Sequence, residues 1–254
     1  MHRMGTVIIA KEPLPDAVYR SQKDKILISA TYFEKGTSKV VLSTSGTGFV
    51  PEISGLVITV RHLIKFEADY DYLFMGTIIT DLEWINFPLY LVAKGETGTY
   101  KDIIVLRPDP ITMEKAWGKY DLDNPNPYRM LLKTSELVDA KVDGKKVYIS
   151  GFSSGVGEYL EADKQPTPIL IDLVNFTFST EITASITSMP VNRVGIKKLL
   201  RLSDGVEQGF SGGKVMNENG QVIGMTIAMS DAENFTFAFS SQDIKQFFKD
   251  HNLK

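Results

Sequence analysis

The stretch GFSGGKVMNENGQVIGMTIA, residues 209–228, decides which class of fold this sequence adopts. Two runs rich in valine, isoleucine and methionine flank Asn219-Gly220, and both of these residues tolerate the positive φ of a tight hairpin turn. The stretch therefore predicts two paired antiparallel strands. Directly before them, Ser211 stands between glycines, where its hydroxyl would be exposed and backbone N–H groups could approach a substrate or a developing oxyanion.

Short apolar runs separated by turn residues fill most of the remaining chain, and they predict an all-β protein. The strands that we expect in the first half cover residues 26–33, 39–50, 55–64, 72–80, 88–92 and 103–106. Those that we expect in the second half cover residues 146–151, 168–174, 181–187, 213–216, 221–229 and 235–239. Gly46 and Gly48 interrupt one of these runs, which indicates a bulge or a close approach of the backbone to another segment.

The end of the chain changes from a β period to a helical one. Ile244, Phe247 and Phe248 follow the i, i+3, i+4 spacing of one helix face, and Ser240 with Asp243 resembles a capping box. Residues 108–129 are rich in proline and polar side chains, as is typical of a linker. The expected organisation is an irregular N-terminal arm (1–20), a first β unit (21–107), the linker (108–129), a second β unit (130–239) and a C-terminal helix (240–254).

The composition narrows the classes of function. The 254 residues carry a formal net charge of −3, and 43% of them are hydrophobic and 23% charged, as in an ordinary soluble globular protein. This composition excludes a disordered chain and lacks the basic character of nucleic-acid binders, so we expect no nucleic-acid partner. The absence of cysteine excludes disulfides and thiolate chemistry, and only three histidines leave little room for a histidine-rich metal site. We therefore expect no metal and no cofactor.

Membrane and export signals are weak in this sequence. No stretch approaches the ~20 apolar residues of a membrane span, so we expect no spanning segment. The apolar run at residues 7–10 is shorter than the roughly 7–15 apolar residues of a signal-peptide core. As the chain stands this predicts a cytoplasmic protein, with an exported form cut before residue 1 as the alternative.

Three strings together indicate nucleophilic catalysis. LVITVRHLI (56–64) is a β run that ends around His62, KDIIVL (101–106) begins a strand beside Asp102, and the glycine turn holds Ser211. Each has a structural explanation when taken alone: a buried strand-end histidine, a turn aspartate, an ordinary glycine turn. Serine is a weak nucleophile that needs a base, histidine is that base near neutral pH, and a carboxylate orients the histidine. The combination predicts a His–Asp–Ser triad in a cleft between the two β units.

The order and surroundings of these strings resemble the chymotrypsin-like serine proteases, most closely the bacterial HtrA/Deg-like protease domain. The matching segments, GTGFV (46–50), GLVITVRHLI (55–64), KDIIVL (101–106), GFSGGKVMNENGQVIGMTIA (209–228) and FTFAFSSQDIKQFF (235–248), follow the family order. The resemblance implies two six-stranded antiparallel β-barrels with a C-terminal helix. It also implies a serine endopeptidase that acts on a polypeptide substrate through an acyl-enzyme. Little chain follows the helix, so we expect no PDZ module.

The resemblance also implies individual roles. His62 would be the general base, Asp102 its orienting carboxylate and Ser211 the nucleophile, and the N–H groups of Gly209 and Ser211 would form the oxyanion hole. One wall of the specificity pocket would come from Asp204, Gly205, Val206 and Gln208. A strand that pairs with the substrate backbone would include Met225, Thr226, Ile227 and Ala228. The small and apolar members of this set favour an apolar pocket, whereas Asp204 would favour a basic substrate side chain.

Four residues depart from the family pattern, and one of them is Ile104, which replaces a small residue after the aspartate. Arg61 precedes the histidine where a small residue is usual, Lys214 follows the two glycines where proline is usual, and Phe210 replaces the aspartate of the animal digestive branch. Two alternatives follow, of which Arg61 and Phe210 motivate the first, and the small cost of flipping a peptide unit in the glycine-rich segment 209–213 motivates the second. One is a catalytically silent protein that binds peptides. The other is a latent protease whose oxyanion loop is ordered by an activating protein partner.

Overall fold

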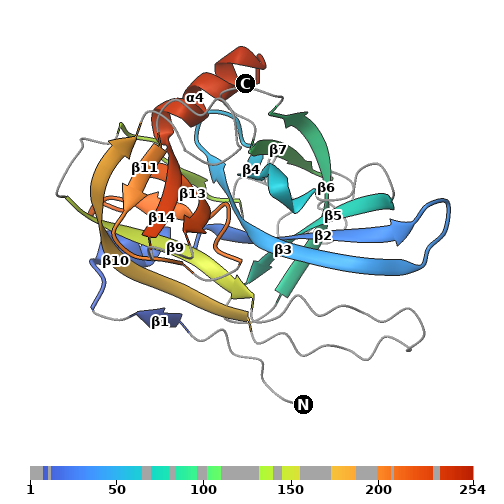
Figure 1. Ribbon diagram of the computed structural model, residues 1–254, viewed down its shortest axis with the longest axis horizontal. Helices are drawn as coiled ribbons and strands as arrows, with labels where there is room; N and C mark the ends of the chain where they lie inside the picture. The colour runs from blue at the N-terminus through green and yellow to red at the C-terminus, as the bar shows by residue number, and fades with distance from the viewer. Residues whose placement is uncertain are drawn as a thin grey trace, which may run out of the picture.

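The computed structural model describes residues 8–10, 13–64, 70–79, 84–95, 102–109, 132–139, 145–154, 173–186, 199–206, 209–230 and 235–253. These residues form two β-barrels that lie side by side, with the C-terminal helix packed at one end (Figure 1). No helix in these ranges is long and apolar enough to cross a membrane.

The first barrel is a closed ring of six antiparallel strands. Its members are β2 (Lys25–Glu34), β3 (Val40–Pro51), β4 (Val57–Val60), β5 (Tyr70–Ile79), β6 (Trp84–Lys94) and β7 (Ile103–Pro108). They pair in the order β2-β5-β6-β7-β4-β3, and pairing of β2 with β3 closes the ring. The short strand β8 (Thr134–Ser135) adds a parallel pairing to the end of β3.

The second barrel repeats this arrangement. Its members are β9 (Lys146–Ser154), β10 (Leu173–Ile186), β11 (Leu199–Leu202), β12 (Lys214–Met216), β13 (Val222–Ser230) and β14 (Phe235–Ser240). They pair in the order β10-β11-β14-β13-β12-β9, and pairing of β9 with β10 closes the ring. The short strand β1 (Ile8–Ala10) pairs in parallel with β10. The predicted fold of two six-stranded barrels is therefore confirmed.

Some elements differ from those expected. The strand predicted over residues 181–187 is the second half of β10, which changes its partner from β9 to β11 at Ile182. Strand β11 was not predicted. The arm predicted to be irregular contains β1 and the helix α1 (Asp16–Ser21), which begins directly after Pro15. The linker predicted over 108–129 lies almost wholly outside the described residues, so the domain boundaries stay a prediction.

The predicted hairpin joins β12 to β13. The Asn217 carbonyl accepts from the Gly220 N–H at 3.0 Å, and the Asn217 N–H donates to the Gln221 carbonyl at 3.0 Å. Gly220 has a φ of 72°, whereas Asn219 is not among the described residues with positive φ. One glycine rather than an Asn-Gly pair therefore supplies the left-handed conformation of this turn.

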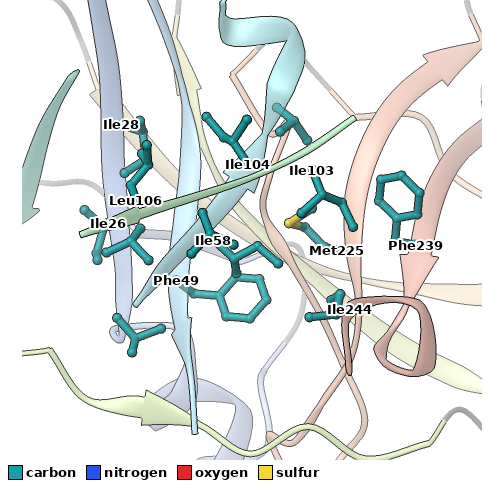
Figure 2. Close-up of a cluster of buried hydrophobic side chains, with 14 of the residues drawn as sticks. Ile26, Ile28, Phe49, Ile58, Ile103, Ile104, Leu106, Met225, Phe239 and Ile244 are labelled. Atoms are coloured by element: carbon teal, nitrogen blue, oxygen red, sulfur yellow. The ribbon is translucent and has the colours of Figure 1, made fainter. Parts of the chain in front are cut away.

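One hydrophobic cluster joins the two barrels and the C-terminal helix, and the second barrel also has a separate cluster of its own. Figure 2 shows side chains of the first barrel, such as Ile58 and Leu106, in one cluster with Met225 and Phe239 of the second. Helix α4 (Ser241–Asp250) contributes Ile244 to this cluster, together with Phe247 and Phe248. Its N-terminus has the predicted capping box between Ser240 and Asp243. Burial of each such side chain contributes about 1.5–3 kcal/mol, so the core holds the barrels in a defined relation to each other.

Candidate active site

His62 lies on a helical turn and not at the end of a strand. Strand β4 ends at Val60, and Arg61–Leu63 forms the 3-10 helix η1, where the sequence predicts strand as far as residue 64. The carbonyl of Leu63 accepts hydrogen bonds from the hydroxyls of Tyr32 and Thr44, the second at 3.1 Å. Strands β2 and β3 therefore fix the turn that carries the histidine.

His62 and Asp102 form a hydrogen-bonded pair. The Nδ1 atom of His62 lies 2.8 Å from Oδ2 of Asp102, and the His62 backbone N–H donates to Oδ1 at 2.8 Å. Asp102 stands just before β7, and its carbonyl accepts the Arg61 N–H at 3.0 Å. Because a carboxylate only accepts, it selects the tautomer that has its proton on Nδ1 and a free lone pair on Nε2. The Asp102 side chain is 11% exposed and that of His62 is 32% exposed, so the ring faces the solvent.

Ser211 occupies a glycine loop beside this pair. A Cβ atom on Gly46 would lie 2.9 Å from the Ser211 carbonyl and 3.1 Å from Cδ2 of Leu63, so the loop and the histidine turn meet at Gly46. This contact accounts for Gly46, whose place inside a strand predicts a close approach of the backbone to another segment. The Ser211 hydroxyl donates to the Ile227 carbonyl at 3.2 Å. The structure therefore brings the Ser211 loop against the turn that carries His62, which in turn is bonded to Asp102, while the serine hydroxyl is bonded to Ile227.

The loop presents two unbonded N–H groups. Gly209 has a φ of 99° and Gly212 a φ of 86°, both in the region that favours glycine. Hydrogen bonds among the described residues use the carbonyls of Gly209, Phe210 and Ser211, but none uses the N–H of Gly209 or of Ser211. These are the two groups that the sequence predicts for an oxyanion hole.

Phe210 and Arg61, the departures beside the triad, have structural partners. Phe210 is 1% exposed within the second barrel, and a Cβ atom on Gly151 would lie 2.6 Å from its ring. Arg61 donates from Nη1 to the carbonyl of Gly95 at 2.6 Å. Neither side chain is bonded to His62, Asp102 or Ser211.

The predicted pocket wall is described in part. Val206 is buried with Phe210, and Gly205 is partly exposed. Asp204 donates its N–H to the Thr180 hydroxyl at 3.2 Å, and its carboxylate accepts from the Ser203 hydroxyl at 2.9 Å. Gln208 lies outside the described residues.

The predicted substrate strand is β13. The side chains of Met225 and Thr226 are fully buried, so they contact core and loop and offer a substrate only their backbone. Pairing with β12 ends at Met225, and from Ile227 to Ser230 the described strands pair with β13 only on the β14 side. Ile227 stands at a bulge in that pairing, and the backbone of Ala228 pairs with Phe237. This part of β13 therefore has an edge that an added strand could pair with.

Two buried lysines lie behind the loop. Lys214 donates from Nζ to the Ser21 carbonyl at 2.8 Å, and burial lowers its pKa to about 8 although Asp24 opposes the shift. Lys25 donates from Nζ to the Ser150 hydroxyl at 2.5 Å. Burial lowers the pKa of Lys25 well below its ordinary value, and the charge of Lys214 adds to this lowering.

Sequence reasoning missed one residue of the site, Thr47. It lies in β3 and bonds to the loop through both its N–H and its hydroxyl. The only signal for it was its position between Gly46 and Gly48, which indicated a close approach of the backbone.

The sequence matches no family model and no curated protein, but solved structures resemble its fold. The Rv3671c protease in an inactive form has 18% sequence identity and a TM-score of 0.57, covering 96% of this chain and 98% of that chain. A serine-to-alanine mutant of Rv3671c from M. tuberculosis H37Rv, also inactive, has 16% identity, a TM-score of 0.57 and 97% coverage of both chains. The HtrA-type protease AlgW with a decapeptide has 14% identity and a TM-score of 0.62, covering 93% of this chain and 66% of that chain. The chain thus has the chymotrypsin-like fold of these serine proteases.

Proposed function

We propose that this protein is a serine endopeptidase that hydrolyses peptide bonds through an acyl-enzyme. The observation that carries the proposal is the His62–Asp102 hydrogen bond of 2.8 Å beside a serine loop whose Gly209 and Ser211 N–H groups bond to no described residue. A base with a free Nε2, a hydroxyl and two N–H donors are the groups that acyl transfer needs.

In the proposed mechanism, the oxygen of Ser211 attacks the substrate carbonyl while Nε2 of His62 takes the hydroxyl proton. Asp102 keeps the ring in its tautomer and stabilises the imidazolium. The N–H groups of Gly209 and Ser211 donate to the oxyanion. His62 then gives its proton to the leaving amine, and water hydrolyses the acyl-enzyme by the same route in reverse.

The substrate would enter as an extended strand along the edge of β13 that none of the described strands pairs with. A backbone N–H of the substrate would donate to the Ile227 carbonyl, which in this structure accepts from the Ser211 hydroxyl at 3.2 Å. The freed hydroxyl would then turn to His62. We propose an apolar specificity pocket, because Val206 contributes an apolar wall and the Asp204 carboxylate is bonded to Ser203.

A second candidate is a latent protease that an activating protein partner switches on. The observation that favours it is the same Ser211–Ile227 hydrogen bond, since a serine held by a carbonyl is not activated by its base. A silent peptide-binding protein is weaker, because Phe210 and Arg61, which motivated it, are engaged elsewhere.

The test is labelling with a fluorophosphonate probe. We expect Ser211→Ala to abolish labelling and His62→Ala or Asp102→Asn to slow it by roughly 10³–10⁴-fold, because each removes part of the activation of the nucleophile. Ser54→Ala is the control and should label like wild type, because Ser54 lies in the turn between β3 and β4 and its hydrogen bonds go to Leu56 and Pro51.

A folded wild type that stays unlabelled would exclude a constitutive peptidase. Appearance of Ser211-dependent labelling on addition of a cell extract would then support the latent protease. Binding of a peptide library, equal in wild type and Ser211→Ala and without cleavage, would instead establish the silent protein.

A further inference from the structure

Thr47 of the first barrel is bonded to the nucleophile loop of the second at two points. Its N–H donates to the carbonyl of Ser211 at 2.8 Å, and its hydroxyl donates to the carbonyl of Gly209 at 3.0 Å. The same hydroxyl accepts the N–H of Phe152, from β9, at 2.9 Å. Thr47 is fully buried, so no water competes for these groups.

We propose that Thr47 is a positioning residue for the oxyanion loop, which we define as Gly209–Gly213. This role rests on the proposed peptidase function. The residue would not touch the substrate. It would fix the two peptide groups that flank the Ser211 N–H, and so hold the peptide that carries this donor in one orientation toward the developing oxyanion.

The geometry of three successive carbonyls supports this role. The first and third, those of Gly209 and Ser211, point to Thr47. The second, that of Phe210, accepts from the Thr226 hydroxyl and from the Gly213 N–H at 2.7 Å, within the second barrel. The Ser211 N–H belongs to the same trans peptide as the Phe210 carbonyl, and in such a peptide the two groups point in opposite directions. The Ser211 N–H therefore points away from Thr226, and Thr47 fixes the peptide groups on both sides of it.

Hydrogen bonds and close packing also fix the position of Thr47 itself. The Thr59 hydroxyl donates to the Thr47 carbonyl at 2.6 Å. A Cβ atom on Gly212 would lie 1.9 Å from that carbonyl, so the loop packs directly against the Thr47 backbone. The hydroxyl gives its one hydrogen to Gly209 and accepts from Phe152, which fixes its rotation. An apolar side chain here would leave a buried carbonyl and a buried N–H unpaired.

The experiment compares Thr47→Val, which keeps shape and removes the hydroxyl, with Thr47→Ser, which keeps the hydroxyl. The matched control is Thr77→Val, because Thr77 is a buried first-barrel threonine whose hydroxyl donates to Oδ1 of Asn86 at 2.6 Å. We expect Thr47→Val to slow fluorophosphonate labelling by about 10²-fold, the usual effect of misplacing a catalytic group by about 1 Å. Thr47→Ser should restore labelling to within a few-fold of wild type, and Thr77→Val should leave it unchanged.

A second measurement does not depend on activity. Hydrogen–deuterium exchange of peptides covering residues 209–213 should be faster in Thr47→Val than in wild type, Thr47→Ser or Thr77→Val. If wild type is never labelled but this exchange pattern holds, the proposed function fails and the positioning of the loop by Thr47 stands. If Thr47→Val labels and exchanges like wild type, or if Thr77→Val loosens the loop equally, the inference is overturned.

Discussion

Two polar joints connect the elements around the nucleophile loop, and they differ in charge. The threonine joint consists of Thr47 and Thr59 with the carbonyls of Gly209 and Ser211. It is neutral, and each polar group of Thr47 has a partner. The lysine joint consists of Gln22, Lys25, Ser150, Thr177 and Lys214. It is charged, and Nε2 of Gln22 has no partner among the described residues.

The two joints therefore have different effects: one fixes the geometry of the loop, and the other lowers the stability of the folded protein. A neutral buried hydrogen bond contributes about 1 kcal/mol and does not titrate near neutral pH, so the threonine joint can hold the loop in one geometry over a wide pH range. Burial of an ammonium group costs several kcal/mol unless it is well paired. Lys214 has Asp24 nearby, but its lowered pKa shows that desolvation outweighs this attraction. The threonine joint therefore positions the loop, whereas the lysine joint makes the stability of the protein depend on pH.

The largest effect should follow from breaking the threonine joint sterically. In Gly212→Ala, the new methyl group would lie 1.9 Å from the Thr47 carbonyl at a φ of 86°. Strain and displacement together should lower the free energy of unfolding by about 4 kcal/mol or more. Guanidinium denaturation measures this loss.

The control for this change is Gly36→Ala. Gly36 has a similar φ of 73°, but a Cβ atom there would meet nothing within 4 Å. In Gly36→Ala only the left-handed backbone conformation should lower the free energy of unfolding, by about 1–2 kcal/mol. Equal losses in the two variants would show that the loop does not pack closely on Thr47.

The three candidate catalytic residues could be identified from the sequence, whereas both joints could not. His62, Asp102 and Ser211 each stand in a local string, and the three strings taken together indicate their chemistry. Thr47 and Gly209 are 162 residues apart, and a bond between them depends on how the barrels pack, which no local pattern encodes.

The buried lysines and the short elements could not be predicted from local sequence either. Lys25 begins a strand, where lysine is ordinarily exposed, so its burial could not be expected. Helix α1 has only six residues, too few to form a stable helix or show a helical period on its own, and strand β11 is defined by its pairing with β10 and β14, which lie elsewhere in the sequence. The six-stranded rings were predictable because longer strands repeat a turn-and-strand pattern that closes into barrels in a known fold.

The next effect concerns the lysine joint and its dependence on pH. The pKa of Lys214 is about 8 in the folded protein and 10.5 when unperturbed, so between these values the unfolded chain binds more protons. The free energy of unfolding should therefore rise with pH over this window, by about 3 kcal/mol for this group. Below pH 8 the full cost of the buried charge is present.

Comparison with Lys214→Met isolates this contribution from other groups that titrate at high pH. Urea denaturation at pH 7, 8, 9 and 10 should show a variant that is more stable at pH 7, with a difference that shrinks as pH rises. Parallel pH profiles for the two proteins would mean that Lys214 keeps an ordinary pKa.

The smallest expected effects come from single hydroxyl deletions, and they distinguish the roles of the two joints. Thr59→Val removes the bond of 2.6 Å to the Thr47 carbonyl, and Ser150→Ala removes the acceptor at 2.5 Å from Lys25. Thr59→Val should lower the free energy of unfolding by about 1–2 kcal/mol, because it deletes one buried hydrogen bond, and Ser150→Ala by about 1–3 kcal/mol, because it also deletes the bond to the Thr177 hydroxyl. Only Thr59→Val should also slow fluorophosphonate labelling, by a few-fold, since only that bond holds the residue that orients the loop. If Ser150→Ala slowed labelling as much as Thr59→Val, the lysine joint would also position the loop. The assignment of this role to the threonine joint alone would then be wrong.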